Sequence, residues 1–286
     1  MVNSSVKATD HIPTLGITEF QIDLHVDGSI QFHEILGPRY IDKPHKHDFF
    51  LFQLFERGSG VHSIDFVDHK VRANQIHLLF PGQVHSWKLG EDTLAHQIMV
   101  SRPVFETFAH ALRYDLVHYQ NHPVLELDTQ IFQKLLYEFQ SVDTELRSET
   151  ILWEIVSARC RIIAQMVSRE VERTFDDLKI YRSKPVLLQY NAFINLHYKE
   201  QKSVSFYAEK LNVSANYLNI LCKRHFHASA TSLIHNRLIL EAKRQLTSRN
   251  TIKEISYNLG FYDLAYFSRF FKSQTGMAPR EFREKL

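Results

Sequence analysis

Two segments near the C-terminal end carry the same pattern of apolar residues, and this internal repeat restricts the fold more than any other feature. Residues 204–223 match residues 252–272, with an offset of 48 before a short break and of 49 after it. Each copy predicts a short helix with one apolar face, a tight turn and a second helix. Asn212 and Gly260 occupy the turn, and both residue types tolerate the left-handed backbone that a tight turn requires. The repeat therefore predicts two helix-turn-helix units.

Helix-capping residues support these boundaries. Ser214 and Asp263 precede the second helix of each unit, where a side-chain oxygen can accept a hydrogen bond from a free backbone N–H group. Thr251 and Glu254 form the T-x-x-E pattern of a capping box. A long apolar-faced helix at 229–248 is expected to fix the spacing between the units. The units are predicted at about 204–226 and 252–275, within an all-helical domain of residues 188–286.

The segment GFYDLAYFSRFFKSQTGMAP, at residues 260–279, resembles the signature of the AraC/XylS family of bacterial transcription regulators. The segments LNVSANYL, at 211–218, and RLILEAK, at 237–243, resemble parts of the same family in the right order. The resemblance implies that the second helix of each unit enters a major groove of promoter DNA, the two grooves being successive on one face of the duplex. It also implies positive control of transcription and recruitment of RNA polymerase.

Exposed side chains near the start of each second helix are the candidates for contacts with base edges. Arg269 is expected to bind guanine, with an ion pair to Asp263 or a phosphate contact as the alternative. Asn216 and Asn219 suit adenine edges, whereas the neighbouring Tyr217 is expected in the core. The full set of base-reading candidates is Ala215, Asn216, Asn219, Ile220, Leu264, Ala265, Ser268 and Arg269. Phosphate contacts are expected from Lys223, Arg224, Lys272 and Arg280.

Charge is distributed unevenly along the chain, although the net charge is only +2. Residues 188–286 contain 15 basic and 7 acidic side chains, a net charge of +8. The remainder contains 19 basic and 25 acidic side chains, a net charge of −6. The basic part suits a polyanion such as double-stranded DNA, with a solvated basic surface as the alternative.

The N-terminal part predicts a different architecture. From about residue 18 to residue 100, short apolar runs alternate with turn residues such as Asp27-Gly28 and Gly58-Ser59-Gly60. This pattern predicts a small antiparallel β domain, a barrel or a jelly roll. The whole chain is therefore expected to be an α+β protein of two domains, with a sensor domain at 1–175, a linker at 176–187 and the DNA-binding domain at 188–286.

Helical periodicity follows the β region, at about 103–114, 129–142 and 148–173. The last of these segments carries an apolar stripe with close to 3.6-residue spacing, formed by Ile151, Ile155, Ala158, Ile162 and Met166. This stripe is expected either to pack on the β domain or to pair with its copy in a homodimer.

Histidines are concentrated in the N-terminal part, which contains 13 of the 17. The pair His45 and His47, followed by His85, resembles the metal-binding pattern of cupins, but Leu51 and Phe52 stand where that pattern has a glutamate. The expectation is therefore a cupin-like domain without metal or other cofactor, in which His45, His47, Phe52 and His85 surround a small-molecule effector pocket. The alternative is a metal-dependent cupin enzyme that carries a DNA-binding domain. The sequence contains no recognisable catalytic motif, so no enzymatic activity is expected.

Cysteine use and hydropathy bear on the cellular location. Cys160 and Cys222 lie far apart and show no metal-ligand spacing, which favours a reduced, cytoplasmic compartment. The sequence contains no run of 18 apolar residues and no signal-peptide pattern, so neither a membrane span nor secretion is expected.

Overall fold

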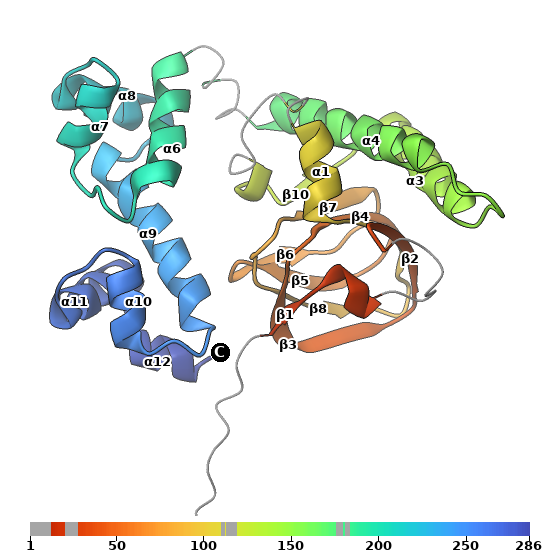
Figure 1. Ribbon diagram of the computed structural model, residues 1–286, viewed down its shortest axis with the longest axis horizontal. Coiled ribbons are helices and arrows are strands. Elements are labelled where there is room, and N and C mark those ends of the chain that lie inside the picture. The colour runs from red at the N-terminus through yellow and green to blue at the C-terminus, as the bar shows by residue number, and fades with distance from the viewer. Residues whose placement is uncertain (1–12, 21–27, 110–111, 113–118, 176–179, 181–183) are drawn as a thin grey trace, which may run out of the picture.

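A computed structural model shows two domains that pack side by side (Figure 1). The structure describes residues 13–20, 28–109, 112, 119–175, 180 and 184–286. A β-rich N-terminal domain, with helices on one face, is followed by an all-helical C-terminal domain, as the sequence predicts. None of the described helices combines the length and the apolar character that a membrane span needs.

Within the described residues, the β strands form two separate five-stranded sheets that pack face to face, a jelly-roll-like sandwich instead of a closed barrel. The first sheet has the order β1 (Thr14–Leu15), β3 (Arg39–His47), β8 (His85–Leu89), β5 (Gly60–Ile64) and β6 (Val67–Lys70). The second has the order β10 (Val124–Glu126), β7 (Gln75–Leu79), β4 (Phe50–Arg57), β9 (Leu94–Val100) and β2 (Ile30–Leu36). A short 3₁₀ helix, η1 (Ile17–Phe20), follows β1.

Strand β4 is buried on both of its faces, which explains its nearly continuous apolar sequence. Leu51 and Phe55 point between the two sheets, because they belong to the inter-sheet clusters. Phe50 and Phe52 point the other way and contact the helices, and the ring of Phe50 stacks on Phe105 with centroids 3.7 Å apart. This outer face is covered by α1 (Arg102–Ala109), α3 (Thr129–Leu146) and α4 (Trp153–Thr174) (Figure 1).

The turn predictions are only partly confirmed. Residues 58–60 connect β4 to β5, which belong to different sheets, so this segment is a crossing and not a hairpin. The two-residue hairpin instead joins β5 to β6 at Asp65 and Phe66, whose φ angles are +48° and +69°. Sequence analysis did not predict it, because phenylalanine is disfavoured at such angles. Asp27 lies outside the described residues.

Helix α4 is present as predicted, but it buries a different face. Val156, Cys160, Ile163 and Val167 are buried against the domain. Ile155 and Ile162, from the predicted stripe, are 39% and 41% exposed. The helix carries apolar residues on two faces, and its periodicity alone does not tell which of them packs. The alternative that the predicted stripe pairs with another chain therefore stays open.

The C-terminal domain contains seven helices in its described residues, 184–286. They are α6 (Pro185–His197), α7 (Val204–Lys210), α8 (Ala215–Phe226), α9 (Ala230–Leu246), α10 (Ile252–Asn258), α11 (Leu264–Thr275) and α12 (Pro279–Glu284). Helix α6 starts inside the segment predicted as a linker, at a proline in the favoured first position. The predicted caps at Ser214 and Asp263 and the capping box of Thr251 with Glu254 are all present.

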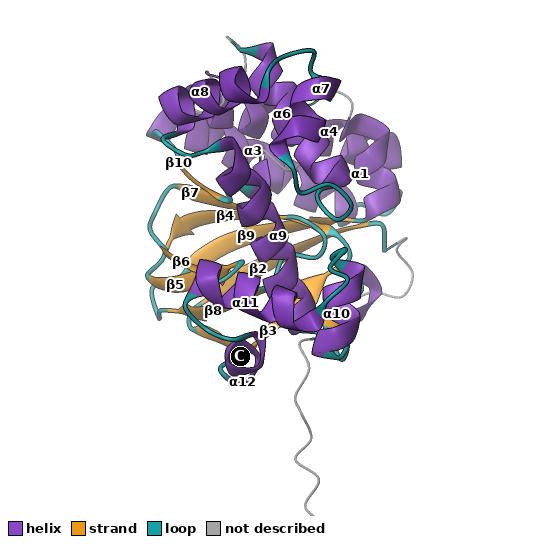
Figure 2. Cartoon of the chain, turned by 90° about the vertical axis from the view of Figure 1, so that its left-hand side faces the viewer, coloured by secondary structure: helices purple, strands orange, loops and turns teal. Residues whose placement is uncertain are grey.

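Helix α9 holds the two helix-turn-helix units at its opposite ends, with α7 and α8 near one end and α10 and α11 near the other (Figure 2). Its buried residues include Leu238, Ala242 and Leu246. Because these side chains contribute to one continuous core, the units cannot separate without exposing apolar surface. The spacing between α8 and α11 is thus set by the length and packing of α9.

We expect Gly260→Ala to destabilise the C-terminal domain more than Gly276→Ala. Both glycines have positive φ, +70° and +78°, so alanine at either position costs about 1–2 kcal/mol of backbone strain. A methyl group at Gly260 would also overlap the carbonyl oxygen of Lys199, whereas nothing lies within 4 Å of one at Gly276. Thermal unfolding of the two variants measures the loss of stability that each substitution causes. Equal losses of stability would show that the contact with Lys199 is unimportant.

Candidate DNA interface and sensor cavity

Helix α8 is the second helix of the first unit, and its four base-reading candidates differ in exposure. Asn216 and Ile220 are exposed, whereas Ala215 and Asn219 are half-buried. The side-chain oxygen of Asn219 accepts a hydrogen bond of 3.1 Å from the backbone N–H of Ala230, the first residue of α9. In this structure Asn219 therefore links α8 to α9.

Helix α11 presents the corresponding candidates of the second unit. Leu264, Ala265 and Arg269 are exposed. Ser268 is half-buried, and its hydroxyl donates a hydrogen bond to the backbone oxygen of Leu264. Three of the four side chains are thus open to a ligand, whereas the hydroxyl of the fourth is already engaged.

The ion pair between Arg269 and Asp263, which sequence analysis kept as an alternative, is absent. Asp263 instead caps α11, and its carboxylate accepts a hydrogen bond of 2.6 Å from the backbone N–H of Tyr266. Among the described residues, Arg269 has no ion-pair partner. Its guanidinium is available for an external acceptor.

Exposed tyrosines are the part of this surface that sequence analysis missed. Tyr217 was expected in the core, and this expectation is wrong because its side chain is 48% exposed. The inner face of α8 is already occupied by Leu218 and Leu221. The equivalent residue of the second unit, Tyr266, is 56% exposed, and Tyr262 in the preceding turn is 96% exposed. The internal repeat could have indicated these exposed tyrosines, because both copies place a tyrosine directly before a buried residue.

The phosphate-binding candidates lie on the surface. Lys223, Arg224 and Lys272 are exposed on the two second helices. Arg280, on α12, is exposed and forms an ion pair of 3.0 Å with Glu284. Such a surface pair contributes little, so it does not prevent Arg280 from turning to another anion.

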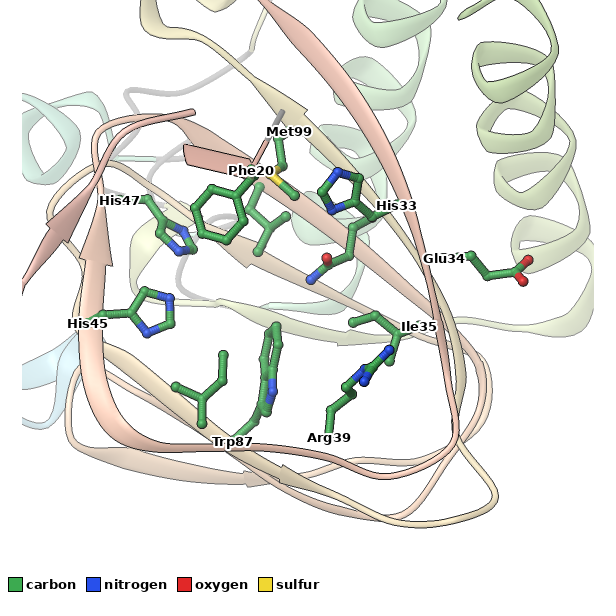
Figure 3. A pocket seen from close by; sticks show the side chains of 12 residues that line it. Phe20, His33, Glu34, Ile35, Arg39, His45, His47, Trp87 and Met99 are labelled. Atoms are coloured by element: carbon green, nitrogen blue, oxygen red, sulfur yellow. The ribbon is translucent and has the colours of Figure 1, made fainter. Parts of the chain in front are cut away.

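The sandwich contains a cavity of about 220 Å³ between its two sheets (Figure 3). His45 and His47 project into it from β3, next to Trp87 of β8 and Phe20 of η1. Of the four residues expected around the cavity, Phe52 and His85 do not line it, and for these two the expectation is wrong. Side chains on a strand alternate between faces, so the neighbouring Leu51 lines the cavity whereas Phe52 faces the helices.

Several polar atoms in and near the cavity are buried without a hydrogen-bond partner among the described residues. They include the indole N–H of Trp87, Nδ1 of His47 and both amide atoms of Gln53. Leaving such groups unpaired costs about 1–3 kcal/mol each, so they are suited to a polar occupant of the cavity. The lining also contains Arg39 and Gln97, so polar groups stand beside a larger apolar surface.

Five buried histidines continue from the cavity wall into the core. His85 contacts His45 and His47 on one side and His62 on the other, and His62 contacts His77. Burial lowers the pKa of all five, and it lowers the pKa of His47 and of His77 to about 3. These imidazoles are neutral near pH 7. Sequence analysis missed His62 and His77, because each is a single histidine in an apolar strand.

An ion pair joins the sensor domain to α9. The carboxylate of Asp65, in the β5–β6 hairpin, accepts two hydrogen bonds from Arg244, of 3.0 and 2.6 Å. The two side chains are only 12% and 10% exposed. The ammonium group of Lys46, between the two cavity histidines of β3, donates a hydrogen bond of 3.1 Å to the backbone oxygen of Arg244.

An aromatic contact extends the same interface to the last helix. The ring of Phe66 packs edge-on against Phe282 of α12, with centroids 5.5 Å apart. The ammonium group of Lys243 lies 5.8 Å from the centre of one ring and 5.7 Å from the other. The sensor domain therefore contacts α9 and α12 of the C-terminal domain through both polar and apolar groups.

Both domains have counterparts in known families. Residues 34–155 match the family described as AraC-like ligand binding domain, and residues 207–285 match a family described as helix-turn-helix domain. Together the two matches cover more than half of the chain, and they fall on the two domains described above.

Similar proteins are transcription regulators. YobQ of Bacillus subtilis, an uncharacterized HTH-type transcriptional regulator, is 34% identical over 33% of this chain and 40% of its own. The HTH-type transcriptional activator RhaS of Escherichia fergusonii is 22% identical over 84% of this chain and 87% of its own. The arabinose operon regulatory protein of Salmonella typhimurium is 24% identical over 85% and 86%. The alignment with YobQ thus spans less than half of that relative.

A sandwich domain with a cavity between its sheets, joined to paired helix-turn-helix units, defines a transcription regulator with a ligand-binding domain and a DNA-binding domain. The two family matches, and the regulators that align over most of the chain, narrow this class of protein to one family. The chain belongs to the AraC/XylS family of transcription regulators.

We expect Asp65→Asn to weaken the contact between the domains by about 3 kcal/mol, because it leaves the buried guanidinium of Arg244 without a counter-charge. In calorimetric unfolding, the two domains of this variant should separate into two transitions. Asp68→Asn, at an exposed position close to the same hairpin, is the matched control. An Asp65→Asn profile that overlays the control would show that the ion pair does not hold the domains together.

Proposed function

We propose that the protein is a sequence-specific DNA-binding regulator of transcription in the cytoplasm, in which α8 and α11 read successive major grooves of a promoter. The observation that carries this proposal is the pair of capped helices at the two ends of α9, each with an exposed outer face. A helix of this diameter fits the major groove of B-DNA, where each base pair presents a distinct pattern of donors and acceptors. The net charge of +8 on residues 188–286 suits the same partner.

Base reading is assigned mainly to α11. Arg269 is exposed, lacks an ion-pair partner among the described residues, and carries the planar donor pair that guanine O6 and N7 accept. Leu264 and Ala265 offer apolar contacts to thymine methyl groups. Ser268 is a weaker candidate, because its hydroxyl already donates to the backbone.

Helix α8 is expected to contribute less sequence information. Asn216 is exposed and suits adenine, whereas the amide oxygen of Asn219 is engaged at the start of α9. Ile220 and Ala215 can contact only apolar groups of the bases. Tyr217, which is exposed beside Asn216, adds a hydroxyl to this surface.

Phosphate contacts supply the affinity that does not depend on sequence. Lys223, Arg224 and Lys272 are exposed on the two reading helices, and Arg280 on α12 is held only by a surface ion pair. Neutralising phosphates releases counterions, so binding is expected to weaken steeply as the salt concentration rises.

The cavity of the sensor domain is proposed to bind a small polar effector. Its volume of about 220 Å³ suits a compact molecule, and the unpaired indole N–H of Trp87 calls for a hydrogen-bond acceptor. Arg39, in the same wall, adds a fixed positive charge. An effector with hydroxyl or carboxylate groups fits this lining.

The route from the cavity to the DNA-binding domain is short. His45 and His47 line the cavity, and Lys46 between them donates a hydrogen bond to the backbone oxygen of Arg244 of α9. An effector that moves β3 would therefore change a contact with the helix that spaces the two reading units. Such a signal requires different effector affinities in the docked and undocked states of the domains.

A homodimer is proposed through the exposed stripe of α4. Ile155 and Ile162 lie about two turns apart, and each leaves roughly two-fifths of its surface in water. Tyr137, on the adjacent α3, is 63% exposed. A second copy of the chain would cover this apolar surface, and two copies would double the number of DNA-reading helices.

Activation of transcription through RNA polymerase is proposed from the relatives. The printed name of RhaS, which aligns over most of this chain, describes a transcriptional activator. A regulator that occupies two successive major grooves on one face of the duplex leaves the opposite face accessible to a second protein.

The DNA proposal is tested by selecting bound sequences from a random DNA pool at a stated salt concentration. We expect one motif that spans two successive major grooves. Arg269→Ala should relax the preference at one base pair, at a cost of about 1–3 kcal/mol. Lys272→Ala, on the same helix, should weaken binding to all sequences and lower the salt dependence by about one counterion. Weak binding without any enriched motif would contradict the proposal.

The dimer proposal is tested by the mass of the protein in solution. Sedimentation should show a dimer for the natural chain and a monomer for Ile155→Glu with Ile162→Glu, because charged groups in an apolar interface lose their hydration. Leu196→Glu, at a position that is 69% exposed on α6, is the control and should stay dimeric. A dimer that survives the double substitution would place the interface elsewhere.

A further inference from the structure

Three buried histidines of the sensor domain direct the same ring nitrogen toward one point. Nε2 of His85 lies 3.0 Å from Nε2 of His45 and 3.2 Å from Nε2 of His47. The side chains of His45, His47 and His85 are 5%, 6% and 1% exposed. All three candidate ligand atoms lie within 4.8 Å of one another. The ring of His47 is stacked on Phe49, with centroids 4.3 Å apart, so packing holds it in place.

A chain of hydrogen bonds behind the cluster determines which nitrogen of His85 carries the proton. The backbone N–H of Arg72 donates a hydrogen bond to the side chain of Gln75, so the atom that receives it is the amide oxygen. The same oxygen accepts a hydrogen bond from Nε2 of His77. Nδ1 of His77 must accept from Nδ1 of His62, and Nε2 of His62 must accept from Nδ1 of His85. In neutral imidazoles, Nε2 of His85 is therefore left with a lone pair.

His45 is in the same situation. It donates a hydrogen bond to the backbone at Lys43, so the nitrogen that faces the cluster, Nε2, also carries a lone pair. Two lone pairs at 3.0 Å repel each other unless a cation lies between them. A proton between them would put a positive charge on a side chain that is only 5% or 1% exposed, and burying a charge without a counter-charge is costly.

The spacing of the nitrogens suits a metal ion. Two imidazole nitrogens bound at about 2.0–2.1 Å to one ion are about 2.9 Å apart at right angles and about 3.3 Å apart at the tetrahedral angle. The separations of 3.0 and 3.2 Å lie between these values. Imidazole is a preferred ligand of zinc, copper, nickel and iron, whereas calcium and magnesium take oxygen ligands.

We propose that His45, His47 and His85 bind one divalent transition-metal ion through their Nε2 atoms, in the wall of the sensor cavity. Sequence analysis favoured a cavity without metal, because the glutamate of the cupin pattern is replaced. In the structure, three histidines alone form the donor set. His62 contacts His85 from the side of the core, and His77 contacts His62 in turn. In metal sites, a ligating imidazole usually donates its other N–H to such a supporting group.

The open coordination position gives the ion a role in sensing, and this part rests on the proposed function of the cavity. Three protein ligands leave a fourth position for water or for a donor atom of an effector. His45 and His47 face the cavity, so this position is accessible from it. Nδ1 of His47, which has no partner among the described residues, then carries the proton of this imidazole, because Nε2 is bound to the ion.

The ion would also fix the strand that contacts α9. Its two ligands on β3 flank Lys46, whose ammonium group donates to the backbone oxygen of Arg244. Holding both neighbours of Lys46 restricts the motion of that side chain. Metal binding and docking of the two domains are therefore coupled through three consecutive residues.

The test measures metal binding by the full-length chain without an affinity tag. Metal-depleted protein is titrated with Co²⁺, whose visible absorption reports nitrogen ligation, and Zn²⁺ is then added as a competitor. We expect about one ion per chain and displacement of Co²⁺ by Zn²⁺. His45→Ala and His47→Gln should each abolish the absorption band. His62→Phe, which removes the support of His85, should weaken binding about 10- to 100-fold.

The control is His33→Ala, because His33 lines the cavity but does not belong to the cluster. It should bind Co²⁺ as the natural chain does. Circular dichroism shows whether each variant is folded, and His47→Gln provides a second variant if His45→Ala does not fold. No absorption band with the natural chain, or a band that survives both substitutions, would overturn the site. DNA binding by the metal-free protein, measured in parallel, separates that failure from failure of the proposed function.

Discussion

Asp65 and Arg244 form a two-bond ion pair that is almost completely removed from water, and taking two charges out of water is costly. The geometry compensates for this cost, because Asp65 also accepts hydrogen bonds from Gln83 and from the backbone of Val84. A pair of this kind tolerates only one arrangement of its partners. The position of α9 on the sandwich, and with it the position of both reading helices, depends on this contact.

Features that depend on neighbouring residues could be predicted from the sequence. The T-x-x-E pattern at Thr251 and Glu254 makes a capping box, and Gly260 takes a positive φ at the predicted turn. Both follow from hydrogen bonds and sterics within a few residues. The repeat then extends these local signals to the whole C-terminal domain, because two copies of one pattern must fold in the same way.

Features that depend on contacts between distant segments could not be predicted. Helix α4 has apolar residues on two faces, and only the position of the second sheet decides that Val156 is buried while Ile155 is exposed. In the same way, His62 and His77 are separate histidines in separate strands until the sheets bring them behind His85. The cavity site therefore appears in the sequence only as the pair on β3 and one later histidine.

Phe66 occupies a backbone conformation that disfavours bulky side chains, at a φ of +69°. Two-residue hairpins of this type prefer Asn-Gly, which adopts both positive angles with little strain. The phenylalanine is useful only because its ring meets Phe282 on the other domain. A relative whose domains do not dock would have no reason to keep an aromatic residue here, and the pair Asn-Gly would be expected in its place. The residue at this one position of the hairpin is therefore expected to differ between relatives with docked domains and relatives with independent ones.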